Sequence, residues 1–198
     1  MLFTNRLNID YPSLIFGETS FSFTDIHKHL GVNFHSSGKW EEHINDMIGK
    51  CMKMIGILRK MKMSLSRKCL NSLCISFIRP VIEYASVYWD NCSMQDSNRL
   101  EKVQTEAARI VTGLTRSVRL ENLYTEVGWV PLSQRRMENK LLTLYKIIQG
   151  IAPNYLYDLL PPLVGQDVQY HLRNYSNFIE PLCRLEIYKK SLSLSQSI

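Results

Sequence analysis

The sequence predicts a mainly α-helical protein that begins with short β-strands and ends in an irregular tail. Short apolar runs separated by turn residues occupy residues 1–36. From 37 to 163, apolar residues recur at steps of three and four, the period of helices with one buried face. Residues 164–198 show no sustained period. We therefore expect a β segment at 1–36, a helical bundle at 37–163 and a loosely ordered tail at 164–198.

The β segment is predicted to contain three strands. Leu14–Phe16 and Phe21–Phe23 flank a turn at Gly17-Glu18, and Ile26–Phe34 places Leu30, Val32 and Phe34 on one face of a third strand. Three short strands without cover form a poor core. We expect neighbouring elements upstream, and we expect exposed strand edges to allow self-association.

Two long helices are predicted next. Ser36 or Ser37 can cap the first, whose buried stripe consists of Trp40, Ile44, Met47, Ile48, Cys51, Ile55 and Leu58. The second begins near Ser66 and keeps its stripe in phase through Pro80, which predicts one kinked helix that reaches Trp89. Its stripe consists of Leu70, Leu73, Cys74, Phe77, Ile78, Val81, Ile82, Ala85, Tyr88 and Trp89. Tyr84 and Tyr88 are expected to pack in the core.

Later helices show their ends in the sequence. Ser93 with Asp96 resembles a capping box, and Gly113 is placed to end the helix that follows. A short helix is expected over 120–127. Another is expected from about 132 to 150, and Pro161-Pro162 ends a final helical turn at 155–160. The inward face of the 132–150 helix is predicted to hold Met137, Leu141, Leu144, Tyr145 and Ile148, whereas Arg135 and Arg136 are predicted to be solvated.

Positive charge is concentrated in one block. The chain has 198 residues, 24 Lys and Arg, 18 Asp and Glu and a net charge of +6. Seven of the 24 basic residues and no acid lie between residues 50 and 68, which leaves 17 basic against 18 acidic residues elsewhere. The block consists of Lys50, Lys53, Arg59, Lys60, Lys62, Arg67 and Lys68. With 45% hydrophobic residues, the chain as a whole is not of the disordered class.

The basic block predicts contacts to nucleic-acid backbone, because phosphates bind cations without regard to base sequence. Lys50, Lys53 and Lys60 are expected on one side of the first helix, and Arg67 and Lys68 open the second. If all seven residues paired with phosphates, log K would fall with log[salt] at about −6. The alternative is a solvated helical face; weak binding to a membrane surface is a third reading.

Sequence motifs for catalysis are lacking. The sequence contains no G-x-x-x-x-G-K-[ST], G-x-G-x-x-G, H-E-x-x-H or G-x-S-x-G. Four histidines, His27, His29, His35 and His43, lie close together, but no cysteine or acid completes a metal-ligand set. We expect no catalytic residue, no metal and no cofactor. Trp40, Trp89 and Trp129 are interpreted as core anchors.

The cellular setting is inferred from the cysteines and the apolar runs. Five cysteines without a C-x-x-C spacing indicate reduced thiols in an intracellular protein, cytoplasmic or nuclear. The longest apolar run, at 141–151, contains Lys146 and is too short to span a bilayer, so no membrane partner is expected.

Short motifs follow one another in a defined order. They are His27–Val32 (HKHLGV), Trp40, His43-Ile44, Ile57-Leu58-Arg59, Tyr84–Trp89 (YASVYW), Leu100–Gln104 (LEKVQ), Ala107–Gly113 (AARIVTG), Gly128-Trp129, Gln134-Arg135-Arg136 and Pro153–Leu156 (PNYL). This ordered set resembles the segment after the catalytic palm in non-LTR retrotransposon reverse transcriptases of the LINE type, jockey-like. The resemblance covers about residues 1–175.

The resemblance implies the end of a palm at 14–34, followed by a thumb and post-thumb region. In that family the palm carries an F/Y-A-D-D motif that binds Mg²⁺, and the thumb holds the template–primer duplex. No F/Y-A-D-D occurs in this sequence, so RNA-directed DNA polymerase activity is not expected to transfer and Mg²⁺ would belong to the missing palm. The expected partners are RNA, DNA or an RNA–DNA hybrid.

Three functional hypotheses follow. The first is a truncated, non-catalytic thumb that binds nucleic-acid backbone. The second is a polymerase subunit that takes its palm from another chain. The third is an inert or domesticated helical module that binds a protein partner through the wide stripe of the second helix.

Overall fold

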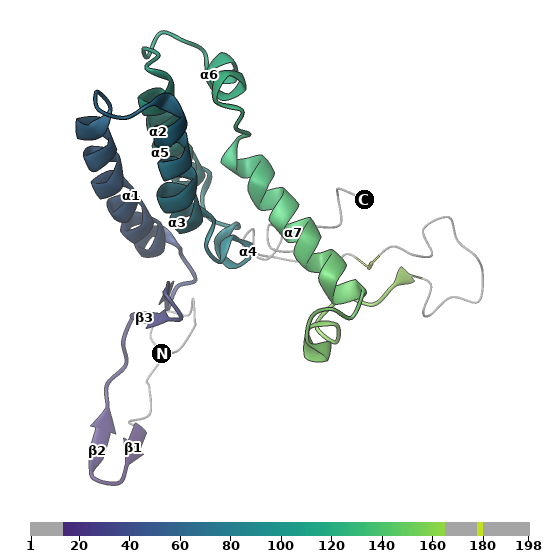
Figure 1. Cartoon of the computed structure of the whole chain (residues 1–198). Coiled ribbons are helices and arrows are strands. Elements are labelled where there is room, and N and C mark those ends of the chain that lie inside the picture. Colours follow the sequence, from purple (N-terminus) through teal and green to yellow (C-terminus); the bar gives the residue numbers. More distant parts are fainter. Residues whose placement is uncertain (1–13, 165–177, 180–198) are drawn as a thin grey trace. The chain divides into compact units, whose positions relative to one another are not determined.

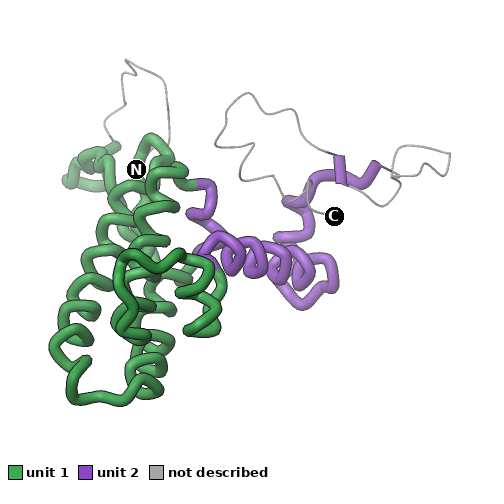
Figure 2. Tube along the Cα trace, turned by 90° about the horizontal axis from the view of Figure 1, so that it is seen from above, with its two compact units in different colours: residues 1–85, 92–130 green, residues 86–91, 131–198 purple. Residues whose placement is uncertain are grey.

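The computed structural model describes residues 14–164 and 178–179 and is mainly helical, with two short antiparallel strand pairs at its start (Figure 1). This confirms the predicted fold class. The chain divides into two compact units, which are treated separately below (Figure 2). Unit 1 comprises residues 1–85 and 92–130, and unit 2 comprises 86–91 and 131–198. The helical region predicted at 37–163 therefore contributes to both units, and most of the predicted tail at 164–198 lies outside the described residues.

The first strand pair in unit 1 consists of β1 (Leu14–Phe16) and β2 (Thr19–Phe21). Phe16 pairs with Thr19 across a turn whose Gly17 has a φ of 62°, a value that glycine adopts without strain. The two-residue turn starts the second strand at Thr19, two residues before the predicted start. Leu14, Ile15, Phe16 and Phe21 are exposed.

The second strand pair corrects the predicted third strand. Residues 26–34 do not form one strand, because β3 (Ile26–His29) turns back into β4 (Val32–His35). Leu30 and Gly31 make the turn with φ values of 45° and 84°. The Tyr84 hydroxyl donates to the Leu30 carbonyl at 2.7 Å, so a contact 54 residues away supports this turn. Leu30 is exposed and Val32 is buried, contrary to the common face predicted for them.

Helix α1 (Glu41–Met61) buries one face, which packs on α5 (Met94–Thr112). The buried face of α1 consists of His43, Ile44, Met47, Cys51, Ile55 and Leu58, close to the predicted stripe. Trp40, half-buried, stands at the N-cap without a side-chain cap bond. The serines predicted to cap α1 have other partners: the Ser36 hydroxyl donates to Asp25 and the Ser37 hydroxyl bonds His35.

The second helical run consists of α2 (Arg67–Leu73), a π-helical segment η1 (Cys74–Ile78) and α3 (Arg79–Glu83). Its N-cap is Ser66, whose hydroxyl accepts from the Cys69 amide. The π segment ends two residues before Pro80, a residue that cannot donate to the helical ladder. Leu70, Cys74, Ile78 and Ile82 are buried as predicted, whereas Phe77 is exposed.

This run ends at Glu83, not at Trp89. Tyr84 has a ψ of 127° and Ala85 a φ of 51°, which leave the helical region, and a separate short helix α4 (Ser86–Trp89) follows. The break changes the direction of the tyrosines: Tyr84 is 52% and Tyr88 69% exposed, so the prediction that both pack in the core is wrong.

The remaining helices of unit 1 begin and end near the predicted residues. The Ser93 hydroxyl accepts from the Asp96 amide at 3.1 Å and starts α5, and Gly113, with a φ of 77°, ends it. Helix α6 (Leu120–Val127) packs on α5. Trp129 is buried and its indole N–H donates to Asn71, in agreement with a core position.

Unit 2 contains α4, α7 (Leu132–Ile148) and a 3₁₀ turn η2 (Asn154–Leu156). Helix α7 packs on α4, and the buried residues of α7 are Leu132, Arg136, Lys140 and Leu144. Of the predicted inward face of α7, Leu144 is buried, whereas Met137, Tyr145 and Ile148 are exposed, so the prediction is wrong for these three. The prediction that Arg136 is solvated is also wrong.

The physical reason is a buried ionic cluster. Asp90, directly after α4, accepts from Arg136 Nε at 2.7 Å and lies 2.5 Å from Lys140 Nζ. The Arg136 guanidinium also faces the ring of the buried Trp89 at 5.7 Å. Asp90, the residue after α4, therefore holds Arg136 and Lys140 of α7 in buried positions, which the apolar pattern of the sequence does not reveal.

Candidate nucleic-acid interface

The seven cations of the basic block lie on α1, on the turn after it and on α2. Helix α1 carries Lys50, Lys53, Arg59 and Lys60; Lys62 follows it, and Arg67 and Lys68 open α2. Because α1 buries its apolar stripe against α5, the opposite face is left to solvent. Six of the seven are exposed, and Lys62 is half-buried.

Three of these cations contact acids: Lys50, Arg67 and Arg59, and the contact of Arg59 with Glu106 is described below. Lys50 Nζ lies 2.8 Å from an Asp46 carboxylate oxygen one turn earlier, and its hydrogen bond lowers the pKa of Asp46. Arg67 contacts Glu126 through two bonds, to the carboxylate at 2.7 Å and to the backbone carbonyl at 2.6 Å. The contacts of Lys50 and Arg67 partly neutralise these two side chains within the fold, which leaves less positive charge available to an external phosphate.

Lys62 lies beside the C-terminal end of α5. A Cβ atom built on Gly113 would be 3.7 Å from Lys62 Nζ. The last carbonyl groups of a helix form the negative end of its dipole, so an ammonium group there stabilises α5. Lys62 therefore has a role within unit 1.

Lys53, Lys60 and Lys68 remain, and we refer to them as the unpaired lysines. All three are exposed, and none has an ion pair with another residue in the described part of the chain. Lys53 and Lys60 are seven residues apart, close to two helical turns, so they project from the same face of α1 about 10 Å apart. Of the predicted site residues, these three are the ones most available to a phosphate backbone.

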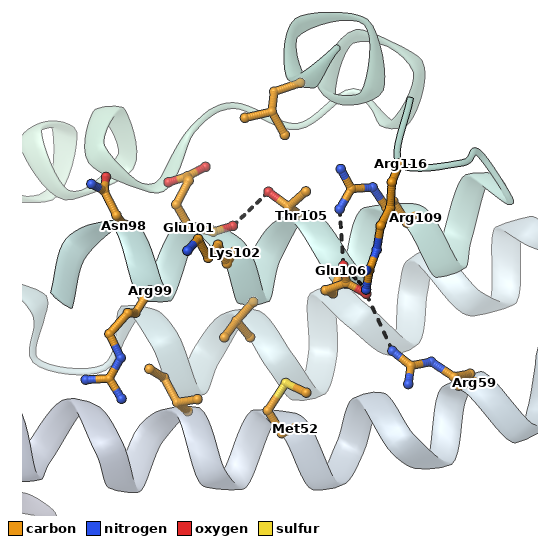
Figure 3. A pocket seen from close by; sticks show the side chains of 13 residues that line it. Met52, Arg59, Asn98, Arg99, Glu101, Lys102, Thr105, Glu106, Arg109 and Arg116 are labelled. Carbon is orange, nitrogen blue, oxygen red and sulfur yellow. Dashed lines mark hydrogen bonds and ion pairs between the residues drawn. The ribbon is translucent and has the colours of Figure 1, made fainter. Parts of the chain in front are cut away.

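Arg59 faces α5 instead. Its guanidinium lies 3.5 Å from Glu106, which also contacts Arg109 at 3.1 Å and Arg116 at 3.6 Å (Figure 3). Sequence reasoning missed Arg109 and Arg116 as site residues. The i,i+3 step from Glu106 to Arg109 is visible in the sequence, but the approach of Arg59, 47 residues away, requires the packing of α1 on α5.

Two buried cysteines of unit 1 are Cys51 on α1 and Cys74 on η1. Burial raises the pKa of the Cys51 and Cys74 thiols to about 11, which keeps them protonated. Cys69, on α2, is exposed. Within residues 14–164 and 178–179, no group of three or more His, Cys, Asp or Glu side chains is placed to hold a metal ion. No helix in the same residues is long and apolar enough to cross a membrane.

The buried His43 of α1 predicts how the stability of unit 1 depends on pH. Burial lowers its pKa from the ordinary 6.5, and its Nδ1 accepts from the Asn33 amide at 3.4 Å. The unfolded chain therefore binds a proton more readily, so stability should fall as pH drops below about 6.5. In urea unfolding at pH 7 and pH 5, His43→Gln should lose less stability on acidification than wild type. His29→Gln, at an exposed position, should match wild type, and an equal loss in the His43 variant would contradict the interpretation.

Comparisons with protein-family models, with curated proteins and with solved structures find no match. The likeness to a reverse-transcriptase thumb consequently rests on the ordered sequence motifs alone.

Proposed function

We propose that unit 1 binds the phosphate backbone of a nucleic-acid duplex, without base specificity, through the unpaired lysines. The observation that carries this proposal is the pair Lys53 and Lys60, exposed on one face of α1 with no acid of the described chain to neutralise it. The ordered motifs that resemble a reverse-transcriptase thumb give independent support, because such a thumb lies against duplex. We favour an RNA–DNA hybrid as the partner for the same reason.

The proposal is limited to binding. The F/Y-A-D-D motif of the polymerase family does not occur in the sequence, and no step of nucleotide transfer is assigned to a residue of this chain. A chain that supplies a palm would be needed for polymerase activity, and extension of a primer only after addition of such a chain would extend the proposal.

Charge reversal on α1 tests the proposal. Lys53→Glu/Lys60→Glu should weaken binding to an RNA–DNA hybrid at least about tenfold at low salt, because two phosphate contacts become repulsions. Filter binding or fluorescence anisotropy gives the affinity. The matched control is Lys28→Glu/Lys39→Glu, which makes the same change in net charge at two other exposed lysines of unit 1.

The control decides between a local site and the overall charge. If both double variants lose affinity equally, the chain's net charge of +6 is responsible and the α1 surface is not the site. If neither variant changes binding, or if wild type fails to bind the hybrid at low salt, the proposal is wrong.

A second candidate function is a protein-interaction module. Ile75 and Phe77, on the helical run that α2 begins, are 37% and 52% exposed. Exposed large apolar side chains can serve as a docking site. Light scattering that finds a self-associating chain, restored to a monomer by Phe77→Ser, together with failure to bind nucleic acid, would favour this function.

A further inference from the structure

A groove between α1 and α5, near the start of α6, contains a cluster of arginines separate from the unpaired lysines. Its volume is about 1020 Å³, and its lining includes Ile48 and Met52 of α1, Val103 of α5 and Leu120 of α6. Arg59 from α1, Arg109 from α5 and Arg116 from the segment after α5 point toward Glu106 (Figure 3). Three elements of unit 1 therefore bring three guanidinium groups to one place.

Glu106 does not saturate these guanidinium groups. Only Arg109 reaches it at an ordinary hydrogen-bond distance, 3.1 Å, whereas Arg59 and Arg116 stand at 3.5 and 3.6 Å. Arg109 Nε is buried and has no hydrogen-bond partner among the described residues. Arg116 is 84% exposed. The cluster thus keeps unused donors beside the groove.

The charge of the cluster selects a class of ligand. The three guanidinium groups and Glu106 give the cluster a net charge of +2, and Glu101 and Lys102, which also line the groove, contribute one charge of each sign. A phosphate monoester carries about −1.5 to −2 at neutral pH, whereas a phosphodiester inside a strand carries one negative charge. Guanidinium groups bind phosphate oxygens through paired N–H donors, which is the geometry that arginine offers and lysine does not.

Two further cations of α5, Arg99 and Lys102, line the same groove. Arg99, Lys102, Glu106 and Arg109 follow at steps of three and four residues, which places them along one ridge of the helix. Arg99 is engaged by Asp96 at 3.0 Å and by Asn45, so it is already neutralised. Lys102 is exposed and can meet the phosphate next to a bound terminus.

We propose that Arg59, Arg109 and Arg116 form a binding site for the terminal phosphate monoester of a nucleic-acid strand. Glu106 acts as the internal counter-ion that holds the three side chains in place until the phosphate replaces it. The proposal rests on the proposed function, because Arg59 and Lys60 are adjacent on α1 and a strand whose end lies in the groove would continue onto the unpaired lysines.

The test compares two forms of one oligonucleotide duplex, with a 5′-phosphate and with a 5′-hydroxyl. The full chain should bind the phosphorylated duplex about tenfold more tightly at pH 7.5, the ratio expected for one added charge-assisted contact. The ratio should fall at pH 5, where the monoester dianion takes up one proton and keeps a single negative charge. Equal affinity for the two duplexes at pH 7.5 would overturn the inference.

Matched variants assign the preference to the cluster. Arg59→Gln/Arg116→Gln, at two exposed positions, should reduce the ratio to about one and leave binding of the hydroxyl form within about threefold. Arg119→Gln changes an exposed arginine outside the groove, and it should keep the tenfold ratio. Loss of the ratio in the Arg119 variant as well, or its persistence in the double variant, would contradict the assignment.

The outcomes separate this inference from the proposed function. Lysine-dependent binding with no preference for the phosphorylated end leaves the proposed function intact and removes the inference. Failure to bind either duplex removes both. Inorganic phosphate or pyrophosphate that abolishes the preference at micromolar concentration would identify a free-phosphate site and overturn the assignment to a strand end.

Discussion

Asp90→Ala should lower the free energy of unfolding of unit 2 by about 3–5 kcal/mol, because removing one partner of a buried ion pair leaves an uncompensated charge. The Arg136 and Lys140 side chains are 5% and 7% exposed, and both contact the Asp90 carboxylate. Urea denaturation followed by fluorescence of Trp89, which faces Arg136, reports on this cluster.

Two comparisons test the cause of that loss. Asp158→Ala removes an exposed carboxylate of unit 2 and should change stability by no more than about 0.5 kcal/mol. Asp90→Leu/Arg136→Met/Lys140→Met removes the charges together and should recover much of the loss. Equal stability of the Asp90 and Asp158 single variants would show that the buried cluster does not hold α4 and α7 together.

Leu100→Ala should destabilise unit 1 by about 2–5 kcal/mol, because truncating a buried leucine removes apolar contact and leaves a cavity. Leu100 is fully buried on α5, the helix against which α1 packs. The denaturation midpoint should fall without a change in the m-value.

A matched apolar position provides the control for Leu100. Ile57→Ala truncates a side chain of similar size at a site on α1 that is 51% exposed, and it should cost less than about 1 kcal/mol. A loss at Ile57 as large as that at Leu100 would contradict the placement of the core between α1 and α5.

Helix boundaries could be predicted where a local interaction sets them. The Ser93 hydroxyl accepts from the Asp96 amide at the start of α5, and Gly113 takes a left-handed conformation at its end. Helix α6 has the predicted bounds, 120–127, and ends at Gly128 with a φ of 72°. These signals involve residues within a few positions of one another, so the sequence contains them in full.

Features set by distant contacts could not be predicted. The turn at Leu30 is supported by Tyr84, and the buried face of α7 is determined by Asp90. An apolar period describes neither, because a polar contact across the fold decides which way the chain turns. For the same reason, the apolar pattern of α7 predicts that Met137 and Tyr145 are buried, whereas the structure buries Arg136 and Lys140.

In the candidate site too, local features could be predicted from the sequence and contacts between distant residues could not. The sequence locates the basic block, and the period of α1 places Lys53 and Lys60 on its solvent face. It does not reveal that Arg67 binds Glu126, 59 residues away, or that Arg59 joins Arg109 and Arg116 at Glu106. Pairing within the fold reduces the cations available for phosphate, which lowers the expected number of backbone contacts.

The salt dependence of hybrid binding tests the central claim most directly. With Lys53, Lys60 and Lys68 as the backbone contacts, log K for an RNA–DNA hybrid should fall with log[salt] at a slope of about −3. If all seven cations of the block bound phosphate, the slope would be about −6. A slope of about −3 that falls to about −1 in Lys53→Gln/Lys60→Gln is the predicted result. A slope near zero, or one that the two substitutions leave unchanged, would contradict backbone binding by α1.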